Sequence, residues 1–222
     1  MHASAPTRLA CVSVLASTLA LSAAAPAYAD SATEKATSKQ LVRAQDRRKG
    51  FIFGFTFGMG VAGASGYPND SSKIGVQSYY DGSDVLGGAG GSLFAMYSLS
   101  DWLSFGVFYA RAQFRSASWY SYGGGGGFRV DLYPLTYAVP ALRDLAVFGK
   151  FGIGTTTLVP TSGSQELSTG TESYLGGGVF YELLVGKHWG IGPTVEYDAE
   201  VTQSNQRSAA LFGGRVAFYT GR

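Results

Sequence analysis

The stretch SYLGGGVFYELLVGKHWGIGPTVEYDAE, from Ser173 to Glu200, decides the fold of this chain. In its second half the residues alternate between two faces. One face carries the apolar residues Trp189, Ile191, Pro193, Val195, Tyr197 and Ala199, and the other carries Gly190, Gly192, Thr194, Glu196, Asp198 and Glu200. A period of two is that of an extended strand, whose successive side chains point to opposite surfaces. Only Gly186, Lys187 and His188 separate this strand from the apolar run before it, so we expect a tight hairpin.

The composition of these two faces is inverted with respect to a soluble β-hairpin. Three carboxylates and two glycines make a poor core, and six apolar residues make a poor water-exposed surface. A transmembrane β-barrel requires this arrangement, because its apolar side chains face lipid and its small or polar ones face the lumen, over strands of about ten residues. The stretch therefore predicts strands of a membrane barrel.

The composition of the chain divides it into two parts. No glycine precedes Gly50, although the 222 residues contain 32, and Tyr28 is the only aromatic residue before Phe51. The formal charge of +2 gives no reason to expect a nucleic-acid partner. The glycine-rich and aromatic part is the part that we expect to fold as strands.

The opening segment reads as a secretory signal. Arg8 precedes an apolar run from Leu9 to Ala25, and the triplet from Ala27 to Ala29 has the small-x-small pattern of a cleavage site. We therefore expect residues 1–29 to be a signal peptide cut before Asp30. The single cysteine, Cys11, would leave with it, and no later segment approaches the 18 apolar residues of a spanning helix.

Residues 30–50 are expected to form a polar periplasmic extension. The stretch from Asp30 to Lys49 holds six Lys or Arg and three Asp or Glu, with no aromatic residue and no glycine. A charge run of this kind is typical of a solvated segment, and a basic hook for a polyanion is the alternative.

Residues 51–222 are expected to form the barrel itself. Period-two patterns predict six strands besides the hairpin pair, at Phe51 to Val61, Leu86 to Leu99, Trp102 to Ala112, Gly123 to Tyr133, Leu145 to Thr157 and Ser208 to Tyr219. Long connections follow the first, third and fifth strands, and less markedly the seventh, whereas two of the other three are two or three residues long. This rhythm is typical of long outer loops and short periplasmic turns. The fold class is therefore all-β: an eight-stranded antiparallel up-and-down transmembrane β-barrel after a cleaved signal peptide. Pro193 predicts a bulge or a lost ladder bond in its strand.

The alternation also assigns side chains to the two surfaces of the barrel. The lipid-facing set comprises Phe51, Phe53, Phe55, Phe57, Phe105, Val107, Phe151, Trp189, Val195, Phe212 and Phe218. The lumen is assigned a charge network of Arg129, Asp131, Lys150, Glu182, Glu196, Asp198, Glu200 and Arg215. We expect Arg129, Lys150, Glu182 and Arg215 to form one belt, in which Glu182 meets Arg215 and Asp131 meets Lys150, because an unpaired buried charge costs about 3 to 5 kcal/mol.

With the signal, the eight strands and the loop rhythm in place, the chain resembles the small eight-stranded outer-membrane barrels. This group includes the OmpA transmembrane domain, OmpX and the opacity-type surface proteins. The resemblance covers Phe51 to Tyr219 and rests on the overall pattern and on the hairpin GGGVFYELLVGKHWGIGPTVEYD. It implies residence in the outer membrane, contact with outer-membrane lipid and a monomeric barrel.

The residues give little support for an enzyme. The only histidine after the signal, His188, falls in an inner turn, which argues against a Ser-His site at the outer leaflet. One histidine without cysteine is too few for a typical metal site. The glycine runs lack a following Gly-Lys-Ser/Thr, so they do not predict a phosphate-binding loop. We expect no catalytic residue, no metal and no cofactor.

Two classes of function remain, together with one soluble alternative. The first is a non-enzymatic integral barrel with a lumen filled by side chains and a structural or surface-interaction role, with residues 62–85 as the expected extracellular contact loop. The second is a barrel that binds or transports a small solute. The third, a secreted lipocalin-like barrel, would require the row from Phe51 to Phe57 to face inward.

Overall fold

The computed structural model describes residues 48–221 apart from 69, 163–166, 169–170 and 203. Its strands are β1 (Gly50–Gly66), β2 (Asp81–Gly82), β3 (Leu86–Ser100), β4 (Leu103–Arg115), β5 (Trp119–Leu132), β6 (Leu145–Pro160), β7 (Leu167–Ser168), β8 (Glu172–Tyr181), β9 (Leu183–Val185), β10 (Trp189–Val201) and β11 (Asn205–Tyr219). Two single-turn 3-10 helices, η1 (Gln77–Tyr79) and η2 (Pro140–Leu142), lie in connections. Within these described ranges, no helix has the length and apolarity needed to cross a bilayer. The predicted signal peptide and most of the predicted extension lie outside the described residues.

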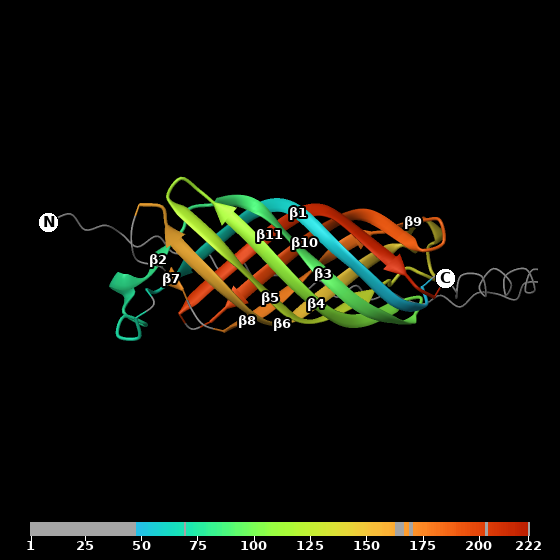
Figure 1. Ribbon diagram of the computed structural model, residues 1–222, viewed down its shortest axis with the longest axis horizontal. Coiled ribbons are helices and arrows are strands. Elements are labelled where there is room, and N and C mark those ends of the chain that lie inside the picture. Colours follow the sequence, from blue (N-terminus) through green and yellow to red (C-terminus); the bar gives the residue numbers. More distant parts are fainter. Residues whose placement is uncertain (1–47, 69, 163–166, 169–170, 203, 222) are drawn as a thin grey trace, which may run out of the picture. The chain divides into compact units, whose positions relative to one another are not determined.

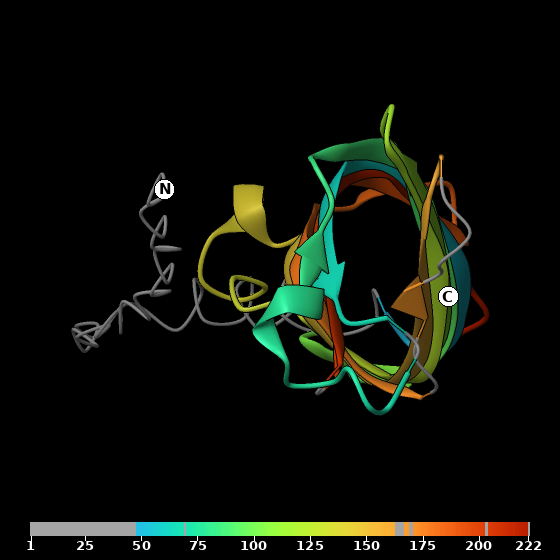
Figure 2. The ribbon, with the colours of Figure 1, turned by 90° about the vertical axis from the view of Figure 1, so that its left-hand side faces the viewer.

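The strands form one closed antiparallel barrel. Each long strand pairs with its neighbour in the chain, and β11 pairs with β1 along its whole length, from Asn205 opposite Gly66 to Tyr219 opposite Ile52. β8 and β9 both pair with β10, so they form one interrupted strand of the wall, and the barrel is eight-stranded. Figure 1 shows the tilted strands from the side, and Figure 2 shows the ring they form. The predicted eight-stranded up-and-down barrel is confirmed.

The register gives the barrel its stagger. Followed once around the wall, paired residues run through Ile52, Met96, Gly106, Arg129, Lys150, Gly176, Asp198, Ala209 and Ala62. The circuit therefore returns to β1 ten residues beyond its starting point. With a rise of about 3.3 Å per residue and about 4.7 Å between strands, this stagger tilts the strands by roughly 40°. Such a barrel is wide enough for side chains to fill.

Several strands extend further toward the end of the barrel that carries the segment 67–85 than the alternation of apolar residues predicts. β1 continues to Gly66 and β4 to Arg115, while β5 begins at Trp119. The long outer loop expected between the third and fourth predicted strands is therefore wrong: β4 and β5 form one long hairpin with a turn at 116–118. The turn expected before the predicted strand at Ser208 is likewise shorter, because β11 starts at Asn205. The added residues of β1 are small, those of β4 and β5 include Phe114 and three aromatic residues, and none of these segments continues the aliphatic and phenylalanine alternation that marks a lipid-facing strand.

The two ends of the barrel differ in their connections. One end carries the long segments 67–85 and 161–171 with two tight turns, and the other end carries the turns at 101–102 and 186–188 with the longer connection 133–144. The predicted alternation of connections thus holds for two of the four outer loops.

Pro193 interrupts one ladder of the sheet, as expected. β8 pairs with β10 up to Phe180 opposite Thr194, and β9 resumes at Leu183 opposite Ile191. The register is the same on both sides of the gap, so pairing is lost without a bulge. The cause is the missing N–H of proline, which cannot donate to a neighbouring strand.

Candidate functional site: the lumen and the outer wall

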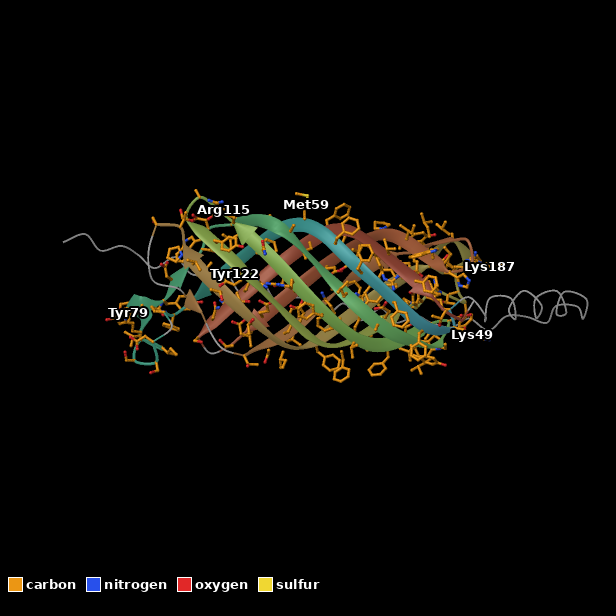
Figure 3. The ribbon with its side chains drawn as sticks, in the orientation of Figure 1. Lys49, Met59, Tyr79, Arg115, Tyr122 and Lys187 are labelled. Carbon is orange, nitrogen blue, oxygen red and sulfur yellow. The ribbon has the colours of Figure 1, made fainter. Side chains whose placement is uncertain are left out.

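The outer wall of the barrel is apolar. The structure places the side chains of Phe51, Phe53, Phe55, Phe57, Phe105, Val107, Phe151, Trp189, Val195 and Phe212 there, each 42–68% exposed, and half-buried Phe218 packs against Trp189 with ring centroids 5.1 Å apart. Figure 3 shows aromatic rings standing out from the ribbon along the barrel. Exposed apolar surface on this scale is unfavourable in water and is favourable against hydrocarbon.

The inner belt of the lumen consists of Arg215, Glu182, Asp131 and Arg129, all fully buried. The structure brings Arg215 and Glu182 together: Arg215 Nη1 donates to Glu182 Oε1, and Arg215 Nη2 lies 3.4 Å from Asp131 Oδ2. The Tyr219 hydroxyl donates to Glu182 Oε2 at 2.5 Å. Gly190, on the neighbouring strand, makes this possible, because a Cβ there would collide with the Glu182 carboxylate.

Arg129 is held between a carboxylate and aromatic rings. Its Nε donates to Asp131 Oδ1 at 2.7 Å, and its guanidinium carbon lies 4.1 Å from the ring centroid of Phe148 and 4.7 Å from that of Phe94. A guanidinium above ring faces gains cation–π attraction, which is stronger when both groups are removed from water. The aromatic residues of the lumen therefore share in neutralising this charge.

The middle belt consists of Lys150, Glu196 and Asp198. Lys150 Nζ lies 3.0 Å from Glu196 Oε2 and 2.7 Å from Asp198 Oδ1. The expected pair of Asp131 with Lys150, and the expected single belt, are wrong. Gly176 stands between Lys150 and Asp198 in the register, so no side chain separates them and Lys150 reaches across β8 to β10. Asp131 is left to the two arginines of the inner belt.

The outer belt consists of Glu200, Arg207 and Glu172, nearer the loop end. Arg207 Nη2 lies 2.7 Å from Glu200 Oε1, and the Thr156 hydroxyl donates to Glu200 Oε2. Asn205 Nδ2 donates to Glu172 Oε1 at 3.4 Å. The sequence interpretation placed Arg207 in a turn and so missed its role. The signal that could have identified Arg207 is its position on the same alternating face as Arg215, two residues after the first residue of β11.

Arg48 closes the end of the lumen opposite the long loops and was also missed. Its Nη2 lies 2.5 Å from Asp144 Oδ1 and its Nε 3.6 Å from Glu182 Oε2, while its backbone N–H donates to Asp101 Oδ1 at 2.9 Å. The guanidinium lies 3.7 Å from the Tyr133 ring centroid. Burial alone would lower the pKa of Arg48, but attraction by Tyr133, Tyr219, Glu182 and Asp144 raises it above its ordinary value. Burial also raises the pKa of Tyr133 to about 12. Within the charge run, nothing in the sequence distinguishes Arg48 from the other basic residues, such as Lys49 beside it.

The arrangement places each lumen cation against at least one carboxylate and leaves little space. A cavity lined by Tyr174, Glu196 and Arg207, among others, has a volume of about 10 Å³, roughly enough for one water molecule. No group of three or more His, Cys, Asp or Glu side chains suited to a metal occurs among the described residues. His188 lies in the turn opposite the long loops, with Nδ1 2.9 Å from the carbonyl oxygen of Tyr219.

Comparisons with known proteins give likenesses of structure. No family model matches the chain. No curated protein matches it. The chain is similar to the crystal structure of Neisserial surface protein A (17% identity, TM-score 0.44, covering 78% of this chain and 98% of that one). It is also similar to Ail, the attachment invasion locus protein of Yersinia pestis (14%, 0.44, 77% and 99%), and to the outer membrane protein OprG from Pseudomonas aeruginosa (12%, 0.43, 78% and 98%).

The class of this protein follows from its own two surfaces. The ladder closes on itself, the wall carries large apolar side chains outside, and the charged side chains of the three belts face the lumen. A closed barrel satisfies every backbone group of its strands without water, as hydrocarbon requires. The fold and the lumen therefore define an eight-stranded transmembrane β-barrel.

The inner belt predicts a large and specific stability effect. Replacing Arg215 with Met leaves Glu182 and Asp131 without their shared cation, and we expect the free energy of unfolding to fall by about 3 to 5 kcal/mol. The double variant E182Q/R215M should lose less than the sum of its two single variants, because the two residues are coupled. Urea unfolding of the folded protein in detergent, followed by gel mobility without heating, measures these changes.

The matched control is Arg143→Gln. Arg143 is 44% exposed and lies 3.6 Å from Asp144, so its loss should change the free energy of unfolding by no more than about 1 kcal/mol. Equal effects of R215M and R143Q would show that the inner belt does not stabilise the barrel.

Proposed function

We propose that the chain is an integral outer-membrane protein that acts through the loops it displays and does not conduct solutes. The observation that carries the proposal is the filled lumen: the inner, middle and outer belts follow one another along the barrel axis, and each is buried and paired. Opening a path would require separating ion pairs whose partners would then be unpaired in a low-dielectric interior. The expected signal peptide and the apolar wall support residence in the outer membrane.

The loop at 67–85 is the proposed contact surface, and it is anchored to the barrel wall. The Tyr80 hydroxyl lies 2.7 Å from Ser65 Oγ and accepts a hydrogen bond from Gln206 Nε2 at 3.2 Å. The Tyr80 ring packs edge-on against Tyr67, with centroids 5.0 Å apart. Strand β2 adds a short antiparallel pairing to the end of β1. These contacts hold the base of the loop in one position.

Beyond this base the loop presents apolar and aromatic side chains to the outside. Ile74, Val76 and Tyr79 are exposed, and Lys73 Nζ lies 5.4 Å from the Tyr79 ring centroid. The hydroxyl and the backbone N–H of Ser72 both donate to Asp70 Oδ1 and lower the pKa of that carboxyl. An ordered loop with exposed tyrosine is typical of protein contact surfaces. The surface is shorter than the expected 62–85, because residues 62–66 belong to β1.

The alternatives differ in what they require of this structure. A solute carrier requires the belts to open. A soluble lipocalin-like barrel requires the row from Phe51 to Phe57 to line the interior. Those rings lie on the outer wall, so this alternative does not fit the structure.

Conductance separates a closed barrel from a pore. The purified full chain, inserted in planar lipid bilayers, should give no steady open-channel current, because the ion pairs of the three belts block the lumen and the cavity beside Glu196 and Arg207 holds about one water molecule. The control is a double variant, E182Q/R215S, which removes the central pair of the inner belt and should give brief current steps where the wild type gives none. Steady currents from the wild type would contradict the proposed function and favour transport.

The display of the 67–85 loop is tested by labelling on intact cells. The mature chain is expected to lack cysteine, so Ser71→Cys in the loop and Lys187→Cys in the opposite turn each introduce one thiol. A membrane-impermeant maleimide should label S71C on intact cells and K187C only after the cells are broken. Labelling of K187C but not S71C on intact cells would invert the orientation and remove this loop as the contact surface.

A further inference from the structure

Two arginines stand out on the apolar wall. Among the outward-facing positions of the described strands, Arg111 and Arg115 on β4 are the only charged side chains. Both are exposed, and neither has an ion-pair partner within the described residues. On the eight long strands the other charged side chains, which form the three belts, face the lumen and are buried or half-buried. Two arginines without an ion-pair partner among the described residues, on an otherwise uncharged wall, indicate a site for a negatively charged ligand.

The arginines lie at the level where the apolar wall ends. On β4 the outward side chains run from Leu103 through Phe105, Val107 and Tyr109 to Arg111, Gln113 and Arg115. At about 2.5 Å of height per tilted residue, Arg111 lies roughly 20 Å and Arg115 roughly 30 Å above Leu103. The apolar band of such barrels is about 25 Å tall, so the pair brackets its upper boundary. Figure 3 shows Arg115 and Tyr122 toward the end of the barrel that carries Tyr79, away from Lys49 and Lys187.

An apolar groove lies on the wall beside Arg111. It has a volume of about 290 Å³ and is lined by Phe55, Gly91, Leu93, Tyr109 and Arg111, among others. Phe55, Leu93 and Tyr109 are cross-strand neighbours in one row, and Gly91 is directly opposite Arg111. Gly124 faces Arg111 from the other side. Because both neighbours of Arg111 are glycines, its guanidinium is open to a ligand that lies flat against the wall.

We propose that Arg111 and Arg115 bind the phosphorylated headgroup of an outer-leaflet glycolipid of the lipid A type, with one acyl chain in the groove beside Tyr109. The proposal rests on the proposed outer-membrane location. Guanidinium groups bind phosphate through paired, charge-assisted hydrogen bonds. Four residues along a strand separate the two arginines by about 13 Å, which suits a ligand that carries two phosphates on a disaccharide. Gln113 and Tyr122, which are paired across β4 and β5, offer polar groups between them.

Charge complementarity selects this occupant over an apolar protein partner. The outer leaflet supplies phosphate anions at the level of Arg111 and Arg115, and the apolar lining of the groove, Phe55, Leu93 and Tyr109, lies next to Arg111 on the side of the hydrocarbon. A helix or strand of another membrane protein would leave both arginines unpaired in a poorly solvated contact, which is costly.

Native mass spectrometry of the folded full chain in detergent tests the site. The probe is lipid A with two phosphates, titrated against the wild type, R111Q/R115Q and the control R143Q/K187Q, which removes two cations at the opposite end of the barrel. We expect R111Q/R115Q to bind roughly tenfold or more weakly, since each lost charge-assisted hydrogen bond costs a factor of about ten. The control should bind as the wild type does. Removing one phosphate from the lipid should weaken binding to the wild type and should have little effect on R111Q/R115Q.

Unchanged binding by R111Q/R115Q, or equal losses in R111Q/R115Q and R143Q/K187Q, would overturn the proposal. Equal affinity for phosphatidylglycerol would overturn the assignment to a glycolipid. Gel mobility without heating shows whether each variant is folded. We expect all of them to be folded, because the substituted side chains make no contact in the lumen. If lipid A binding fails the test but the barrel is closed and labelled as expected, only the lipid site is wrong and the proposed function stands. Channel currents from the wild type, or labelling of K187C but not S71C on intact cells, would instead contradict the proposed function.

Discussion

The structure depends on the register of a closed ladder that brings the cations of the three belts within reach of carboxylates. The ten-residue stagger sets Gly176 between Lys150 and Asp198, and brings Arg215 from β11 to Glu182 at the break between β8 and β9. A slip of one residue on any strand would exchange its two faces, moving ionic groups into hydrocarbon and phenylalanines into the lumen. The apolar wall and the ionic lumen therefore both favour the same strand register.

Glycine allows this packing at particular places. Gly190 leaves room for the Glu182 carboxylate, and Gly176 leaves room for the Lys150 side chain. The lumen is thus filled by long charged residues and phenylalanines that stand opposite residues with no side chain. This explains why the glycine content is confined to the barrel, and why a charge network can form in an interior of eight strands. The same device acts outside, where Gly91 and Gly124 flank Arg111.

Much of the fold could be predicted because the decisive signal is local. Alternation in the hairpin around Lys187 and in the row from Phe51 to Phe57 is readable residue by residue, and it gave the strand count and the direction of each face. Partners across the lumen were harder, because they depend on the stagger, which no single strand reveals. Glu182 and Arg215 were matched from their heights, but Lys150 was assigned to the wrong carboxylate. Arg48 was missed because a buried arginine next to a strand looks like one more member of a charge run.

The most direct test of the account is the direction of the side chains on β4. With the three native tryptophans replaced by phenylalanine, Phe105→Trp and Phe108→Trp each provide one reporter on the same strand through the same substitution. Phe105 is 45% exposed on the wall, whereas Phe108 is 5% exposed and packs in the lumen against Tyr174. In bilayers of lipid with brominated acyl chains, the account predicts strong quenching of tryptophan fluorescence at position 105 and little at position 108. Strong quenching at 108 with none at 105 would contradict it.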